Sequence, residues 1–147
     1  MKHFIKPDLF TIIISVFCIV LLVYLVFKTI HYPYWSIFSI TLVVFLAFAY
    51  FATKMPIYTY ADKNKIMVKQ LIGRKVFNRD TVYTQKISNV DMKGTFRLFG
   101  SGGFLGYIGW FSNPALGKFY MIAGNKKDLL LITTATGRKY VINCPLN

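Results

Sequence analysis

The sequence predicts a pair of membrane-spanning helices followed by an all-β domain. Before residue 54 the chain contains two long runs without a charged residue, and after it come short runs rich in β-branched and aromatic residues. The short runs recur at intervals of about ten residues with turn-forming residues between them, a spacing typical of sandwiches and small barrels. We therefore divide the chain into a helical hairpin at 1–53 and a β domain at 54–147.

The two uncharged runs cover residues 9–27 and 34–53. At about 1.5 Å per residue the first forms a helix of roughly 28 Å, close to the thickness of a bilayer's hydrocarbon core. Both runs are apolar on every side, whereas a core helix of a soluble protein has one apolar stripe. The first run is too long for the apolar region of a signal peptide, and no small-x-small cleavage pattern follows it. We expect two transmembrane helices, the first capped by Asp8.

The connector between the two runs, residues 28–36, is short enough to make them a hairpin. It carries Tyr32, Tyr34 and Trp35, residue types that favour the membrane interface. Of the 18 Lys and Arg residues in the chain, only Lys28 lies in this connector. Because basic residues stay on the cytoplasmic side, we expect a multi-pass protein with both termini in the cytoplasm.

The runs after Pro56 read as strands, and no stretch beyond Lys54 has a helical period. The turns between them are DKN, NRD, NKKD and ATGR, which are rich in the residues that favour turns. The expected strands are 57–61, 65–72, 74–77, 81–92 (as one strand or two), 118–124, 129–134 and 139–144.

The second half of the chain resembles the bacterial pleckstrin-homology-like (PH) domain family, in its membrane-anchored form. The resemblance rests on RLFGSGGFLGYIGWF (97–111), LGKF (116–119), a hairpin at 120–134 and the closing GRKYVIN (137–143), and it covers roughly 57–144. It implies a PH-like antiparallel barrel or sandwich in the inner membrane of a bacterium. Barrels of that family generally end in a helix that closes one open end, whereas this chain stops at CPLN. A shorter family form, a helix supplied by a partner or a truncated chain would each account for that.

The chain is strongly basic, with a formal net charge of +13, and residues 54–147 hold 15 basic residues and four Asp. A basic domain tethered to a membrane is drawn to anionic lipid, so we favour lipid over nucleic acid as the partner of this charge. The same alternating charges would also suit a solvated face. The candidate contacts for an anionic surface are Lys63, Lys65, Lys69, Arg74, Lys75 and Arg79.

The segment 97–111 combines five glycines with large apolar residues. It is not a phosphate loop, because no Gly-Lys-Ser/Thr follows, and no acidic residue stands where a dinucleotide fingerprint needs one. Two alternatives remain: the apolar residues fill the core while glycine shapes the backbone, or they form a loop that contacts the membrane or a partner. The candidate contacts are Phe104, Leu105, Tyr107, Ile108 and Trp110.

The sequence predicts neither catalysis nor a cofactor. It contains no Glu, and the two histidines, His3 and His31, flank the first membrane helix on opposite sides. Cys18 and Cys144 lie in different parts of the chain, so no disulfide or metal site is indicated.

We therefore expect a non-enzymatic integral membrane protein whose PH-like domain mediates protein–protein association or self-association. This expectation rests on the missing end helix, because an open barrel end or edge strand is a place where another chain can add. The alternative is an anionic-lipid-binding module that uses the basic residues and the apolar glycine-rich segment.

Overall fold

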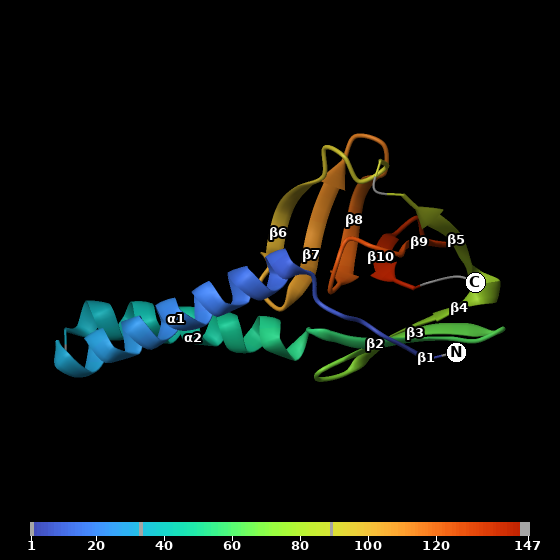
Figure 1. The fold of residues 1–147 in the computed structure, drawn as a ribbon. Helices are drawn as coiled ribbons and strands as arrows, with labels where there is room; N and C mark the ends of the chain where they lie inside the picture. The colour runs from blue at the N-terminus through green and yellow to red at the C-terminus, as the bar shows by residue number, and fades with distance from the viewer. Residues whose placement is uncertain (1, 33, 89, 145–147) are drawn as a thin grey trace.

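The computed structural model describes residues 2–32, 34–88 and 90–144 and shows a helical hairpin that projects from a two-layer β domain (Figure 1). Helices α1 (Leu9–His31) and α2 (Trp35–Thr53) lie side by side. By length and composition both helices could cross a membrane. α1 continues past residue 27, where the sequence prediction ended it, so Lys28 belongs to its last turn rather than to the connector. A cation is favourable there, beside the negative end of the helix dipole.

Polar side chains fix both ends of the helical hairpin. The Asp8 carboxylate accepts a hydrogen bond of 2.8 Å from the Thr11 backbone N–H, which confirms the predicted N-cap. Near the other end, the hydroxyls of Thr29 and Thr41 lie 2.9 Å apart and link α1 to α2. An interhelical hydrogen bond of this kind stabilises helix pairs in an apolar environment.

The described residues form ten strands in two sheets, joined by a short 3-10 helix at Arg79–Thr81. Sheet A has the order β1-β2-β3-β4, and sheet B has the order β5-β9-β10-β8-β7-β6. The strands of sheet A are β1 (Lys2–Phe4), β2 (Pro56–Ala61), β3 (Lys65–Gln70) and β4 (Arg74–Asn78). Those of sheet B are β5 (Val82–Ile87), β6 (Phe96–Gly103), β7 (Gly106–Asn113), β8 (Gly117–Ala123), β9 (Leu129–Thr134) and β10 (Lys139–Asn143).

Three features of this topology differ from the sequence prediction. β1 lies in the part assigned to the helical hairpin, and its Phe4 pairs with Tyr58 of β2. The expected strand 81–92 ends at Ile87, after which the chain bends, and the glycine-rich segment forms the β6–β7 hairpin. The expected hairpin at 120–134 does not form, because β10 lies between β8 and β9 and runs parallel to β8. The last residues of the predicted domain, 145–147, lie outside the described part of the chain.

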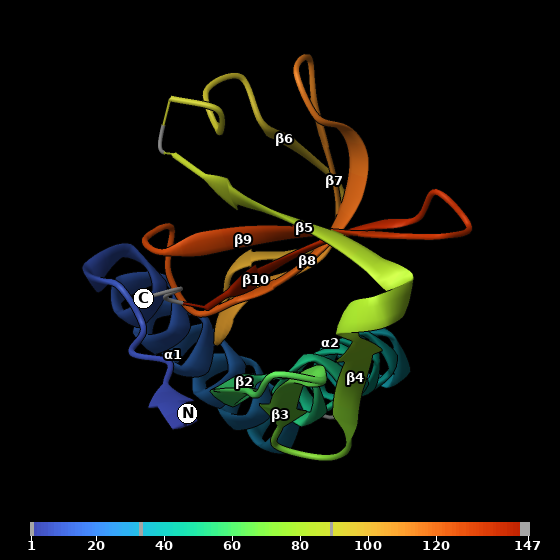
Figure 2. The same cartoon turned by 90° about the vertical axis from the view of Figure 1, so that its right-hand side faces the viewer.

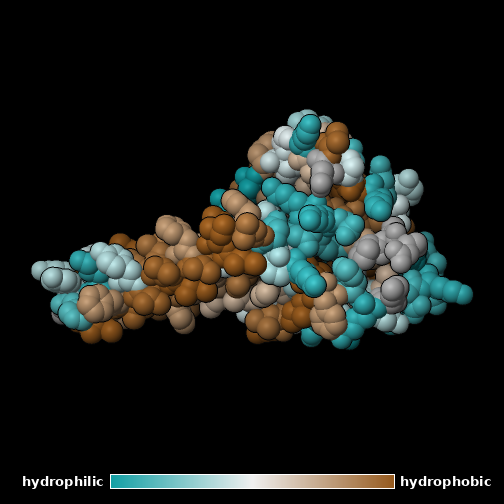
Figure 3. Space-filling model, in the orientation of Figure 1, coloured by the Kyte–Doolittle hydropathy of each residue, from teal (hydrophilic) through white to brown (hydrophobic). Residues whose placement is uncertain are grey.

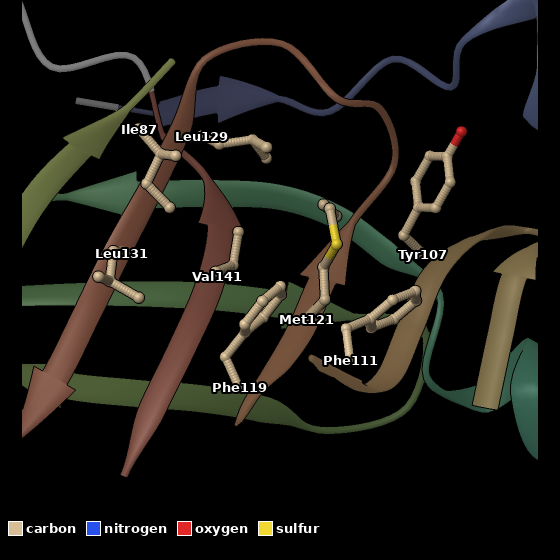
Figure 4. Packing of buried hydrophobic residues seen from close by; sticks show 9 residues of the cluster. Ile87, Tyr107, Phe111, Phe119, Met121, Leu129, Leu131 and Val141 are labelled. Carbon is tan, nitrogen blue, oxygen red and sulfur yellow. The ribbon is translucent and has the colours of Figure 1, made fainter. Parts of the chain in front are cut away.

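Sheet B is strongly curved and has an apolar core on each face (Figure 2). On its convex face, Ile122, Leu130, Ile132 and Ile142 pack with Ile66, Val68 and Phe77 of sheet A. Within its curl lies a second cluster, whose side chains point toward one another (Figure 4). Its buried members are Ile87, Tyr107, Phe111, Phe119, Met121, Ala123, Leu129, Leu131 and Val141. No helix follows β10 among the described residues, in agreement with the sequence.

The buried side chain of Asn143, at the end of β10, holds the connection between β8 and β9 in place. Its Oδ1 accepts from the Gly124 N–H at 2.8 Å, and its Nδ2 donates to the Lys127 carbonyl at 2.6 Å. The carbonyl of Asn143 accepts from the Thr59 hydroxyl of β2 at 2.6 Å. These bonds tie the 124–128 connection to the end of β10. Asn143 therefore links the β8–β9 connection, β10 and sheet A.

We predict that Asn143→Ala lowers the free energy of unfolding by about 3 kcal/mol, or roughly 10 °C in the unfolding midpoint, because it leaves buried backbone groups unpaired. The measurement is thermal unfolding of the full chain in detergent. Asn78→Ala, on the exposed part of β4, is the matched control. Equal midpoints for the two variants would contradict this role of Asn143.

Candidate functional site

Three polar residues on one face of α1 attach the helix to the β domain. Asp8, Thr11 and Ser15 follow one another at helical spacing, and Thr11 and Ser15 are the buried residues of α1. The Tyr107 hydroxyl donates to Asp8 Oδ2 at 3.1 Å, and the Thr11 hydroxyl donates to the Gly124 carbonyl at 3.4 Å. Further along, the Leu105 N–H donates to Ser15 Oγ at 2.9 Å. We call Asp8, Thr11 and Ser15 the polar stripe.

The contact between Asp8 and Tyr107 changes the pKa of both groups. Burial alone would raise the pKa of Asp8, but the hydrogen bonds from Thr11 and Tyr107 and the charge of Lys126 outweigh it and lower this pKa below 3.8. Burial, together with the Asp8 carboxylate, raises the pKa of Tyr107 to about 12. At neutral pH the carboxylate is therefore ionised and the phenol keeps the proton that it donates.

The turn between β6 and β7 packs against both helices. The ring of Phe104 stacks on Phe48 of α2, with 4.5 Å between the ring centroids. A side chain at Gly103, where φ is +149°, would approach Phe10 and Ile14 of α1 to 3.1–3.4 Å. Glycine is needed there both for the backbone angle and for the close approach to the helix.

Hydrogen bonds inside the protein hold part of the turn's backbone. The Ser101 hydroxyl lies 2.7 Å from the Phe104 carbonyl and 3.2 Å from that of Gly106. The Leu105 N–H is held by Ser15 of α1. These bonds lower the cost of placing the turn beside the helices in an apolar environment.

The five apolar candidates of the glycine-rich segment therefore separate into three groups. Tyr107 and Ile108 are buried in the β domain, as the core alternative expected. Phe104 and Leu105 are half-buried in the turn against the helices. Trp110 is 43% exposed on the opposite face of β7 from Tyr107, and its ring packs on Tyr120. Each alternative from the sequence thus fits some residues of the segment.

A second apolar turn lies beside the helices, between β3 and β4. Leu71 and Ile72 are 53% and 64% exposed. Their N–H groups donate to the carbonyls of Met55 and Thr53 at the end of α2, each at 2.9 Å. The sequence analysis did not select this turn, although two apolar residues before a turn glycine, followed by Arg74 and Lys75, gave a local signal.

We define the helix end of the β domain as the end that adjoins the first turn of α1 and the last turn of α2. Strand register divides the six predicted basic residues between this end and the far end. Lys69 pairs with Arg74, and Val68 pairs with Lys75, next to the β3–β4 turn at the helix end. Lys63, Lys65 and Arg79 lie at the far end, around the β2–β3 turn. Lys54, at the C-cap of α2, also lies at the helix end.

The helix end thus combines two apolar turns with the cations Lys54, Lys69, Arg74 and Lys75 beside the last turn of α2. Apolar side chains cover the helices, and polar ones gather on the β domain beyond them (Figure 3). In the described part of the chain, no three His, Cys, Asp or Glu side chains come together as a metal site would need. Chemically, the arrangement can bind an anionic surface with an apolar interior.

Comparison with known proteins gives one match. The family model described as bacterial PH domain matches residues 58–145, which is more than half of the chain. No curated protein and no solved structure matches the chain.

We predict that acid weakens the attachment of α1 to the β domain through Asp8. Because folding lowers the pKa of Asp8, its carboxylate stabilises the folded chain above pH 3.8, and this contribution is lost as the pH falls through the lowered value. Asp8→Asn keeps an N-cap side chain but removes the charge, so its unfolding midpoint should fall less than that of the wild type between pH 5 and pH 3. Asp62→Asn is the exposed control and should follow the wild type. A wild-type response in Asp8→Asn would disprove the role of this carboxylate.

Proposed function

Because this chain belongs to the bacterial PH domain family and carries two helices that could cross a membrane, we propose that it is a membrane-anchored module that binds the anionic surface of the bilayer. The observation that supports this function best is the helix end, where two apolar turns and the cations Lys54, Lys69, Arg74 and Lys75 lie beside the helices. The proposal assigns binding rather than catalysis to the chain. It places the protein in the bacterial inner membrane with both termini in the cytoplasm.

In this arrangement the two apolar turns enter the membrane beside the helices. Ser15 lies six residues after Leu9, the first residue of α1, which corresponds to a depth of about 9 Å along the helix. The β6–β7 turn reaches the same level, because Leu105 bonds to Ser15. The bonds from Ser101 and to Ser15, together with the packing of Phe104 on α2, favour such a position. Leu71 and Ile72 lie closer to the surface, near the last turn of α2.

The cations at the helix end then lie at the level of the lipid headgroups. Each basic residue near an anionic leaflet contributes about 1 kcal/mol, so Lys69, Arg74 and Lys75 together contribute about 3 kcal/mol. Lys63, Lys65 and Arg79, which lie at the far end of strands β3 and β4, contribute much less because the attraction falls off within about 10 Å.

We predict that anionic lipid accumulates at the helix end. Trp35→Phe leaves Trp110 as the only tryptophan of the chain, which can be reconstituted with phosphatidylcholine and phosphatidylglycerol. Brominated phosphatidylglycerol should quench Trp110 more than brominated phosphatidylcholine, and added salt should reduce this preference. Replacing Lys69, Arg74 and Lys75 together with Gln should reduce it strongly.

The matched control replaces Lys63, Lys65 and Arg79 with Gln, which removes the same charge from the far end. This variant should keep the lipid preference. Equal quenching by the two lipids in the wild type, or equal loss in both triple variants, would refute binding through the helix end.

The exposed edge of sheet B favours a second function, self-association. β6 is an edge strand of sheet B, and its Phe96, Leu98 and Phe99 are exposed, Phe99 by 71%. Unpaired strand edges with large apolar side chains are places where another chain adds. In this proposal a second copy pairs with β6 at the membrane surface.

We predict that charge on the β6 edge prevents this association. Leu98→Lys should weaken association by about tenfold, because an edge lysine disfavours strand pairing. Energy transfer between two labelled populations of the full chain in liposomes measures it. Val76→Lys, on the edge strand β4 of sheet A, is the control. Absence of energy transfer in the wild type would exclude the second function and leave lipid binding unaffected.

A further inference from the structure

A cavity of about 350 Å³ lies within the curl of sheet B, beside the first turn of α1. Its apolar wall comes from Phe10, Met92, Phe111 and Met121. The remaining lining residues are Thr95, Arg97, Gly102, Tyr107 and Lys126. A neighbouring cavity of about 360 Å³ shares Met92 and Lys126 with the first and adds Asp8, Lys93 and Lys127. Ligand pockets in proteins have volumes of about 300–1,000 Å³, so the space is large enough for a ligand.

The cavity owes part of its space to Gly102, which has no side chain on the inner face of β6. Cross-strand partners share a face, and Tyr107, Gly109 and Phe111 of β7 are opposite Gly102, Gly100 and Arg97. Tyr107 and Phe111 belong to the inner apolar cluster, and Figure 4 shows the hydroxyl of Tyr107 pointing away from the other members. Two of the three inner positions of β6 are glycine. The guanidinium of Arg97 lies over the space that a side chain at Gly102 would occupy, at 3.3 Å from its Cβ.

The rim of the cavity is cationic. Arg97, Lys93 and Lys127 are exposed and make no side-chain hydrogen bond or ion pair among the described residues. The ammonium of Lys126 lies 5.0 Å from the centroid of the Tyr107 ring. Asp8 is the one carboxylate of the lining, and its oxygens already accept from Thr11 and Tyr107. The lining thus has four cations and one carboxylate, and that carboxylate is already hydrogen bonded to Thr11 and Tyr107.

We propose that this cavity binds an anionic amphiphile with a single alkyl chain. The chain lies against Phe10, Met92, Phe111 and Met121, and the anionic headgroup lies at Arg97 and Lys126. An apolar wall with a few convergent polar groups at one side is the usual composition of a ligand site. A volume near 350 Å³ holds part of one alkyl chain but not the two chains of a folded-in phospholipid. The site goes beyond the proposed surface binding, since it takes one molecule inside the β domain.

The position of the cavity gives such a molecule a route of entry. Phe10, a lining residue, belongs to the first turn of α1, where the helix leaves the β domain. A chain from the cytoplasmic leaflet, or a free amphiphile from solution, reaches the same apolar wall there. The shared chemistry is an alkyl chain that ends in a negative charge.

The test uses dodecyl phosphate with a diazirine at its chain end, added to the full-length protein in phosphatidylcholine nanodiscs. After irradiation, we expect adducts on Met92, Phe111 or Met121. Excess unlabelled dodecyl phosphate should remove these adducts, and inorganic phosphate alone should not. Competition by lysophosphatidylglycerol, which has one chain, would identify a membrane lipid as the source, and competition by dodecanoate alone would identify a free amphiphile; both support the site.

Three variants separate the site from general partitioning into the nanodisc. Arg97→Gln and Lys126→Gln should each lower labelling of β7 and β8 by about tenfold, because a hydrogen bond to a charged group is lost. Gly102→Val should also block it, by filling the space under Arg97. Arg138→Gln, in the exposed β9–β10 turn, is the control and should label like the wild type. Thermal unfolding shows which variants fold. If Gly102→Val does not fold, Arg97→Gln still tests the site.

Adducts confined to α1 and α2, equal labelling by the neutral dodecanol analogue, or equal labelling of Arg97→Gln and Arg138→Gln would overturn the proposal. The variant with Lys69, Arg74 and Lys75 replaced should keep the cavity adducts. Failure of surface binding and failure of the cavity site are therefore distinguishable.

Discussion

The attachment of α1 to the β domain through the polar stripe is the constraint on which the rest of the structure depends. Asp8, Thr11 and Ser15 each hydrogen bond to a different part of sheet B: to the Tyr107 side chain, the Gly124 carbonyl and the Leu105 N–H. Hydroxyl groups on an otherwise apolar helix need partners within the protein when water is absent. Three such bonds along two helical turns fix the rotation of α1 about its axis and its position along that axis relative to the β domain. They also determine which end of the sheets adjoins the helices, and so which cations lie there.

The glycines of β6 and β7 have two consequences that follow from one property, the missing side chain. At Gly103 it allows the β6–β7 turn to approach α1 closely enough for Leu105 to reach Ser15. At Gly102 it leaves space beneath Arg97 on the inner face of β6, where the cavity lies, and at Gly100 it lets β6 and β7 approach each other closely. The apolar residues between these glycines then belong to different surroundings. Tyr107 and Phe111 face the inner cluster, whereas Trp110 and Phe99 pair on the other face and remain exposed.

Sequence reasoning predicted what depends on local pattern and missed what depends on distant contacts. The uncharged runs, the N-cap at Asp8 and most strands of the β domain follow from composition, period and turn residues, and the PH-like fold followed from the order of these elements. β1 has three residues and no pattern of its own, and it is a strand only because β2 is there to pair with it. The insertion of β10 between β8 and β9 brings Asn143 to partners 16–19 residues away in the sequence, which no local pattern predicts. The six basic residues formed one group along the chain, but β3 and β4 are long enough to carry them to opposite ends.

The N-terminal residues make the β domain discontinuous in sequence, and this affects how it can be studied. A fragment beginning at Lys54 would lack β1 and would expose the edge of β2. It would also lose Ile5, which is buried. A Cβ added at Gly124 would lie 2.6 Å from the Ile5 side chain, so Ile5 packs tightly against the β8–β9 connection. Finally, Tyr107 would lose Asp8, and the cavity would lose Phe10 from its wall. Because each of these contacts comes from the N-terminal segment and the first turn of α1, these residues are part of the β domain's structure, and its properties belong to the full chain.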